Sequence, residues 1–134
     1  VKTPKPSELE LQVLSVLWER GPLTVRDLQE NLPDGKQRAY TTVLSVLQVM
    51  EKKGLVKHTR DGLAHLYRPA VDRDKVLTQL MGGLLKNVFG GRPSAVLQCL
   101  LDAENVDEEE LSEIRKLIAE FSDTRKPKKK GRRR

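Results

Sequence analysis

Residues 39–69 read AYTTVLSVLQVMEKKGLVKHTRDGLAHLYRP, and this stretch decides the fold. Its first part places Val43, Val46, Leu47 and Met50 at spacings of i, i+3, i+4 and i+7, the pattern of one buried helix face. Gly54, which follows two lysines, can end that helix with a left-handed cap. Beyond it, residues 55–60 and 63–68 flank Asp61-Gly62, a strong signal for a β-hairpin. The stretch therefore predicts a helix followed directly by a two-stranded hairpin.

Two more helices are expected before this stretch. Ser7 with Glu10, and Thr24 with Asp27, each have the spacing of a capping box at a helix start. Gly21-Pro22 ends the first helix, and the turn residues at 32–35 end the second. Three helices and a hairpin within about 70 residues is the order of a winged helix-turn-helix, whose third helix enters the major groove of DNA.

The chain after the hairpin is expected to be helical. Apolar residues recur at helical spacing up to Gly90-Gly91, then in a short helix capped by Ser94 and in a final helix capped by Asp107. These helices carry more apolar surface than about 50 residues bury alone, so we expect an intertwined homodimer. The alternative is a self-contained three-helix core. The residues expected to form the dimer interface are Leu77, Leu80, Leu84, Val88, Leu111, Ile114, Leu117, Ile118 and Phe121.

The expected fold class is therefore mainly α with a small β hairpin. A winged helix-turn-helix domain at residues 7–70 is followed by an all-helical dimerisation domain at 71–123 and a basic tail at 124–134. We expect the tail to be disordered because it has no apolar residue to bury. It is either a solubilising end or an arm that adds affinity for nucleic acid without sequence preference.

Charge is distributed unevenly along the 134 residues. Residues 1–75 carry 13 cations and 10 acids, residues 76–124 carry 4 and 9, and residues 125–134 carry 8 cations and no acid. The net charges are thus +3, −5 and +8. Contact with a polyanion is expected from the first and last segments, and the acidic middle segment should stay away from DNA.

Composition also excludes several classes of protein. No apolar run approaches the roughly 20 residues of a membrane span, and the first residues lack a signal-peptide core. Cys99 is the sole cysteine, which excludes an internal disulfide and a Cys-x-x-Cys metal site, so a reducing cytoplasmic setting is the default. Among apolar neighbours, Cys99 is expected to be a small buried hydrophobe.

Catalysis is not expected. His58 and His65 lie on the predicted hairpin without a paired carboxylate constellation, and no glycine-rich phosphate loop accompanies them. We therefore expect a protein that is not an enzyme and that has no cofactor and no bound metal, although the cross-strand placement of the two histidines leaves a weak case for metal binding.

The third helix has an outer face suited to DNA. Thr41, Leu44, Ser45 and Gln48 lie opposite its apolar face and can contact base edges or a thymine methyl group. Cations around it can hold phosphates, or can simply be solvated, and Tyr40 can bond a phosphate or cover the turn. The expected DNA-binding residues are Arg38, Tyr40, Thr41, Thr42, Leu44, Ser45, Gln48, Lys52, Lys53, Lys57, Arg60 and Gly62.

Four segments resemble one family. They are residues 39–43, residues 50–56, Arg60-Asp61-Gly62 and Leu66-Tyr67, and together they resemble the penicillinase repressor and methicillin-resistance repressor family of bacterial transcription factors. The resemblance runs from about Ser7 to Phe121. It implies a repressor that binds a near-palindromic operator as a homodimer, with Tyr40 to Gln48 as the reading helix and Arg60 to Gly62 as the wing.

The resemblance also brings in a sensor protease as a candidate partner. Some relatives are inactivated by cleavage at an Asn-Phe bond, where this chain has Gln98-Cys99, and this departure weighs against proteolytic induction. Other relatives sense copper through a group of cysteines, which a chain with Cys99 alone does not support.

Two other function classes remain open at this point. A winged helix can serve as a protein-interaction module, and a basic tail can make an architectural protein that binds nucleic acid nonspecifically. A repressor differs from both because it keeps its preference for one duplex when nonspecific competitor is added.

Overall fold

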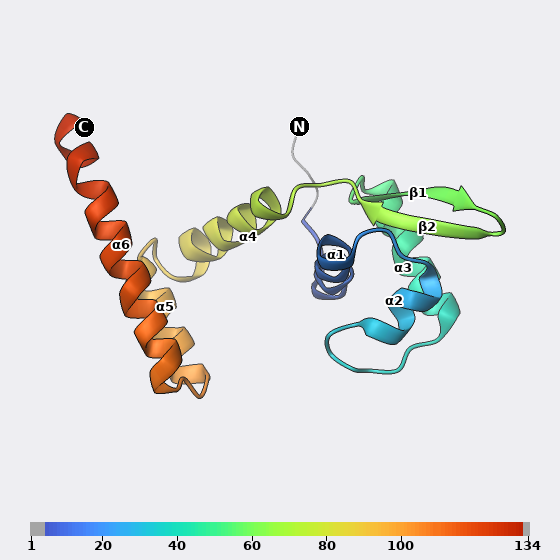
Figure 1. Ribbon diagram of the computed structural model, residues 1–134, viewed down its shortest axis with the longest axis horizontal. Helices are drawn as coiled ribbons and strands as arrows, with labels where there is room; N and C mark the ends of the chain where they lie inside the picture. The colour runs from blue at the N-terminus through green and yellow to red at the C-terminus, as the bar shows by residue number, and fades with distance from the viewer. Residues whose placement is uncertain (1–4, 133–134) are drawn as a thin grey trace. The chain divides into compact units, whose positions relative to one another are not determined.

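The computed structural model describes the backbone of residues 5–132 and the side chains of residues 5–124 (Figure 1). Helices α1 (Glu8–Arg20), α2 (Val25–Asn31) and α3 (Tyr40–Lys52) precede strands β1 (Val56–Asp61) and β2 (Ala64–Pro69). Helices α4 (Arg73–Val88), α5 (Pro93–Ala103) and α6 (Glu108–Arg132) follow. This order confirms the expected fold class, a winged helix-turn-helix followed by an all-helical part.

The chain divides into two compact units, Val1–Leu84 and Leu85–Arg134. The division falls within α4, whose early residue Val76 is buried. The domain boundary that we expect after residue 70 lies earlier, in the link between β2 and α4. In the structure, therefore, the first turns of α4 belong with the winged helix.

Capping boxes begin the first two helices. At α1, Ser7 Oγ accepts the Glu10 N–H (3.2 Å) while the Glu10 carboxylate accepts the Ser7 N–H (2.9 Å). At α2, Thr24 and Asp27 make the same exchange at 3.1 and 3.3 Å. Each box satisfies backbone donors that the first turn leaves open. Both boxes confirm the sequence-based prediction.

The core of the first unit joins α1, α2, α3 and the hairpin. Val43, Leu47 and Met50 of α3 are buried, as their spacing predicts, whereas Val46 is only half-buried. These three side chains pack with the buried residues Val13, Leu14, Leu17, Leu28, Leu55, Val56 and Tyr67. Packing this face of α3 inward turns its opposite face to solvent.

The hairpin turn lies one residue later than expected. Asp61 pairs with Ala64, so the two turn residues are Gly62 and Leu63, not Asp61 and Gly62. Gly62 has a φ of +65°, which glycine adopts readily at the first central position of a two-residue turn. Side chains alternate along the strands, so His58 and Arg60 lie on one face of the hairpin and Lys57 on the other.

The second unit leaves much of its apolar surface open. No residue of α5 is buried, and Leu117 and Ile118 of α6 are more than half exposed. Cys99 is also exposed, which contradicts the expectation of a buried hydrophobe, because nothing in a single chain covers this side of α5. A further correction concerns the start of α5. Its N-cap is Arg92, with Pro93 as the first helical residue, and not Ser94.

Helix α6 continues through Arg132, beyond the expected start of the basic tail. Lysine and arginine are compatible with a helix, although Pro127 removes one backbone donor there. The side chains after Thr124 and the whole of residues 133–134 lie outside the described part, so disorder of the tail stays a prediction. Within the described residues, no helix is both long enough and apolar enough to cross a bilayer.

Candidate nucleic-acid interface

The outer face of α3 consists of small and uncharged side chains. Thr41, Thr42, Ser45 and Gln48 are exposed, and Leu44 is half-buried. None of the four polar side chains forms a hydrogen bond within the described residues, so their donors and acceptors are free for an external partner. This face combines low charge with available hydrogen-bonding groups, as contact with base edges requires.

The start of α3 has no side-chain cap. Its N-cap residue is Ala39, whose methyl group cannot accept a hydrogen bond from the first turn. Open N–H groups and the positive end of the helix dipole favour an anion at this position. A DNA phosphate is one such anion.

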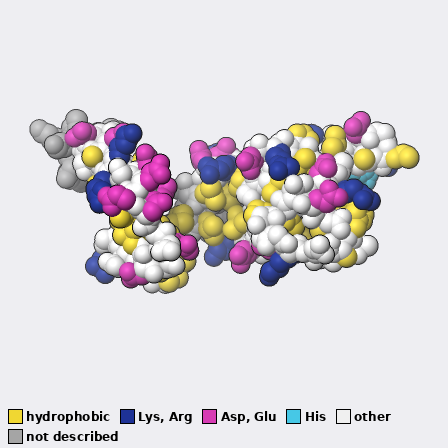
Figure 2. Space-filling view, turned by 60° about the horizontal axis from the view of Figure 1, so that its bottom comes forward, with side chains coloured by type: hydrophobic (Ala, Val, Ile, Leu, Met, Phe, Trp, Pro, Cys, Tyr) yellow, Lys and Arg dark blue, Asp and Glu magenta, His cyan; other side chains and the backbone are white. Residues whose placement is uncertain are grey.

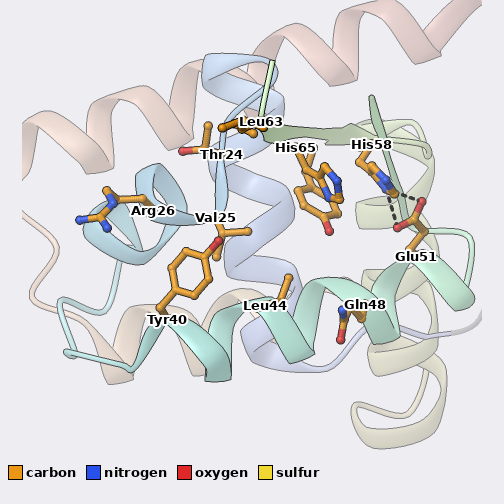
Figure 3. Close-up of a pocket in the computed structure, with 12 residues that line it drawn as sticks. Thr24, Val25, Arg26, Tyr40, Leu44, Gln48, Glu51, His58, Leu63 and His65 are labelled. Carbon is orange, nitrogen blue, oxygen red and sulfur yellow. Dashed lines mark hydrogen bonds and ion pairs between the residues drawn. The ribbon is translucent and has the colours of Figure 1, made fainter. Parts of the chain in front are cut away.

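A cleft of about 700 Å³ lies between α3 and the hairpin (Figure 3). Tyr40, Leu44, Gln48 and Glu51 form its α3 side, and the start of α2 adds Arg26. The hairpin side consists of His58, Leu63, Ala64, His65 and Tyr67. Leu44 and Gln48 of the outer face of α3 therefore border one continuous hollow with the wing, whereas Thr41 and Ser45 do not line it.

Glu51 connects the hairpin to the end of α3. Both oxygens of its carboxylate lie 2.9 Å from His58 Nδ1 (Figure 3). The His58 ring stacks on His65 with 4.4 Å between ring centroids, and Tyr67 lies 5.2 Å from His58. Burial, with the negative charge of Glu51 adding to it, raises the pKa of Tyr67. These contacts hold β1 against α3.

No group of three or more His, Cys, Asp or Glu residues suited to a metal ion occurs in the part of the chain that the structure describes.

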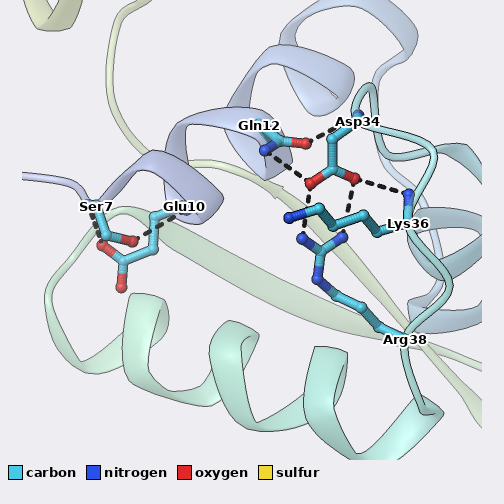
Figure 4. A network of polar contacts seen from close by, with 6 residues as sticks. All are labelled: Ser7, Glu10, Gln12, Asp34, Lys36 and Arg38. Carbon is cyan, nitrogen blue, oxygen red and sulfur yellow. Dashed lines mark hydrogen bonds and ion pairs between the residues drawn. The ribbon is translucent and has the colours of Figure 1, made fainter.

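Arg38 is engaged within the loop before α3. It donates two hydrogen bonds to Asp34, at 2.7 and 3.1 Å, and Asp34 also accepts from Gln12 of α1 and from the Lys36 N–H (Figure 4). The Arg38 hydrogen bonds hold the pKa of Asp34 well below its ordinary value. The structure thus gives Arg38 a role in shaping the α2–α3 loop, and a phosphate contact by this side chain stays a proposal.

Lys53 is also engaged. Its Nζ donates to both carboxylate oxygens of Glu10, at 2.9 and 3.0 Å, and the Glu10 residue is only 5% exposed. Burial alone would raise the pKa of Glu10, but the hydrogen bonds from Lys53 and Ser7 outweigh it and lower the pKa. This ion pair ties the C-terminal end of α3 to the first turn of α1.

The remaining predicted cations are more available. Lys52, Lys57 and Arg60 are exposed and have no acidic partner within residues 5–124. Arg60 shares its face of the hairpin with His58, which borders the cleft, whereas Lys57 points to the opposite face. Gly62 forms the turn at the tip. Among these cations, Lys52 and Arg60 are the better placed beside the outer face of α3.

The sequence-based prediction missed Arg26. It is exposed in the first turn of α2 and borders both the α3 cleft and a second hollow of about 450 Å³ beside the α2–α3 loop. A cation near the start of a helix opposes the helix dipole, so helix stability does not account for it. This mismatch makes Arg26 a further candidate for contact with an anion.

Comparison with known proteins places the chain among bacterial repressors. The family described as penicillinase repressor matches residues 6–120. The transcriptional regulator BlaI of Mycobacterium tuberculosis is 37% identical over 123 residues, which cover 90% of this chain and 87% of that protein. The penicillinase repressor of Bacillus licheniformis is 22% identical over 125 residues, and the alignment covers 93% of this chain and 98% of that protein.

A solved structure is also similar. It is the solution structure of monomeric Bacillus licheniformis BlaI in complex with the blaP half-operator. The two chains are 26% identical with a TM-score of 0.47, and the match covers 55% of this chain and 89% of the other. The family match extends over most of the chain, through the winged helix and well into α6. The chain belongs to the penicillinase repressor family.

Proposed function

We propose that this protein is a transcriptional repressor that binds operator DNA sequence-specifically through α3 and the wing. The observation that carries the proposal is the outer face of α3, where Thr41, Ser45 and Gln48 are exposed and unbonded in a chain of a repressor family. A helix with a free polar face can enter the major groove and contact base edges there.

Each side chain on this face suits a particular contact. Gln48 can pair with adenine through two hydrogen bonds, and Thr41 and Ser45 can donate to or accept from several bases. Leu44 is half-buried, so only part of it is available to a thymine methyl group. Lys52, Arg60 and Arg26 would hold phosphates, which fixes orientation without adding sequence preference.

We further propose that the operator is bound by a homodimer. Support comes from apolar side chains that the single chain leaves largely exposed, with exposed fractions of 62% for Leu117 and 66% for Val88. A second copy would remove this surface from water. A two-fold dimer presents two copies of α3 and therefore predicts an inverted-repeat operator with half-sites one helical turn apart, or a multiple of it.

We do not extend the proposal to proteolytic induction. The Gln98-Cys99 pair departs from the Asn-Phe bond of cleaved relatives, and it lies inside α5. A helical peptide bond has to unwind locally before a protease can bind it in an extended form.

Selection of bound duplexes from a random pool tests the proposed function. We expect an inverted repeat to be enriched and to stay bound when nonspecific competitor is present. Retention that is blind to sequence and lost on removal of residues 125–134 would instead identify an architectural protein that uses its tail. Absence of both kinds of binding would favour a protein-interaction module.

A further inference from the structure

Leu63 is an unusual residue at the tip of the wing. Its side chain is 100% exposed, although leucine is among the residues most often buried in proteins. Figure 2 shows hydrophobic atoms protruding at the edge of the first unit where the hairpin ends. Leu63 belongs neither to the core nor to the half-buried side chains packed against it. The folded chain therefore gains no packing energy from this side chain.

The turn itself does not require leucine. Gly62 supplies the positive φ at the first turn position, and glycine, asparagine, aspartate and serine are the residues that such turns favour. A large apolar residue beside Gly62 thus has no conformational advantage over a polar one. The side chain is better explained by something outside the chain.

The position of Leu63 indicates what that partner is. Leu63 and Ala64 border the same cleft as Leu44 and Gln48 of α3 (Figure 3). A duplex that rests on the outer face of α3 therefore also meets the end of the hairpin. A major-groove helix and a wing beside it contact neighbouring grooves of one duplex, so the groove next to the tip is the minor groove.

We propose that Leu63 is an apolar wedge that enters the minor groove next to the sequence contacted by α3. This inference rests on the proposed function. Leucine is one of the side chains that DNA-binding proteins insert between base steps, and a minor groove about 6 Å wide accepts a single branched side chain.

Charges near the tip agree with a groove contact. Asp61 lies on the face of the hairpin opposite the cleft, so its charge is directed away from the proposed contact, whereas Arg60 lies on the cleft side and can bind the phosphate at the groove edge. An inserted side chain partly unstacks a base step. We therefore expect Leu63 to favour flexible pyrimidine–purine steps at this position of the operator.

The test uses the full chain and the duplex obtained by selection, with 2-aminopurine placed at successive flanking positions. Wild-type protein should raise 2-aminopurine fluorescence at one flanking step, because unstacking relieves quenching. Leu63→Ala should remove this rise and weaken operator binding about tenfold, since most of the apolar contact is lost. Thr59→Ala, an exposed change on the opposite face of the hairpin, should preserve both signals.

Leu63→Lys and the 2-aminopurine signal together separate a wedge from a backbone contact. A cation is attracted both by phosphates and by the minor groove, so affinity alone does not separate the two cases; a wedge predicts that Leu63→Lys loses the 2-aminopurine signal, whereas a backbone contact predicts no such signal even in wild type. The inference is overturned if Leu63→Ala binds within about twofold of wild type, or if wild-type protein raises the 2-aminopurine signal at no flanking step. Failure of wild-type protein to prefer any duplex would instead overturn the proposed function, so the two failures can be distinguished.

Discussion

Replacement of Lys53 by alanine should reduce stability more than it reduces DNA binding. The change removes the partner of Glu10, whose side chain is 7% exposed against 32% for Lys53. Breaking a fully buried ion pair costs about 3 to 5 kcal/mol, but solvent around Lys53 reduces this, so we expect about 1 to 2 kcal/mol. For a domain of this size, that corresponds to a fall in Tm of roughly 4 to 16 °C.

The effect should depend on pH in a defined direction. The pKa of Glu10 is lowered in the folded chain, so the stabilisation by Lys53 is present above the ordinary value of 4.5 and is lost as pH falls through the lowered pKa. The free energies of unfolding that urea titration gives for wild type and Lys53→Ala should therefore differ by the full amount of about 1 to 2 kcal/mol at pH 7. The two values should approach each other in acid.

Lys52→Ala is the matched control. Lys52 lies in the same turn but is exposed and has no acidic partner among the described residues, so its removal should change stability by no more than about 0.5 kcal/mol. It should weaken binding to all duplexes and lower the salt dependence by about one phosphate contact. If Lys53→Ala were as stable as Lys52→Ala yet bound all duplexes more weakly, Lys53 would be a phosphate contact and our reasoning would be wrong.

Other substitutions test the reading face, the dimer, α4 and α2. Gln48→Ala should cost about 1 to 3 kcal/mol at a single base pair, and an equal loss on random duplex would remove Gln48 from the reading residues. Leu117→Asp should convert a dimer into a monomer with weakened operator binding, and an unchanged sedimentation profile would count against that interface. Gly82→Ala should raise stability by about 1 kcal/mol in urea unfolding, because the added Cβ meets nothing within 4 Å. Arg26→Ala should leave the unfolding free energy unchanged or slightly higher while weakening binding to every duplex, and a loss of stability would contradict this assignment.

Local signals predicted the helices of the first unit well. The capping boxes at Ser7 and Thr24 depend on residues three positions apart, and the buried face of α3 depends on spacing within one helix. Both are properties of a short segment, so the sequence contains them directly. The hairpin was predicted too, but its turn shifted by one residue because Asp61 extends the ladder and Gly62 takes the first turn position.

Contacts between distant segments were not predictable in the same way. Lys53 and Glu10 are separated by 43 residues, and nothing in either segment indicates the other. The exposure of Cys99 has a different cause. An apolar sequence pattern predicts that a surface is buried, but it does not show whether the same chain or a second chain buries it. Spacing identified the outer face of α3, whereas only the structure shows which surrounding cations are already paired.

Two ion pairs flank α3, and a histidine–carboxylate contact joins it to the hairpin. Arg38 and Asp34 fix the loop before the helix, Lys53 and Glu10 fix its end to α1, and Glu51 with His58 holds the hairpin beside it. A helix held at both ends loses little conformational entropy when it binds, which leaves more of the contact energy for affinity. Arg38 and Lys53 already have acidic partners within the chain, so a phosphate contact by either side chain would have to compete with that partner. We therefore expect sequence preference to come from the uncharged residues between them, and nonspecific affinity from the cations that have no acidic partner among residues 5–124.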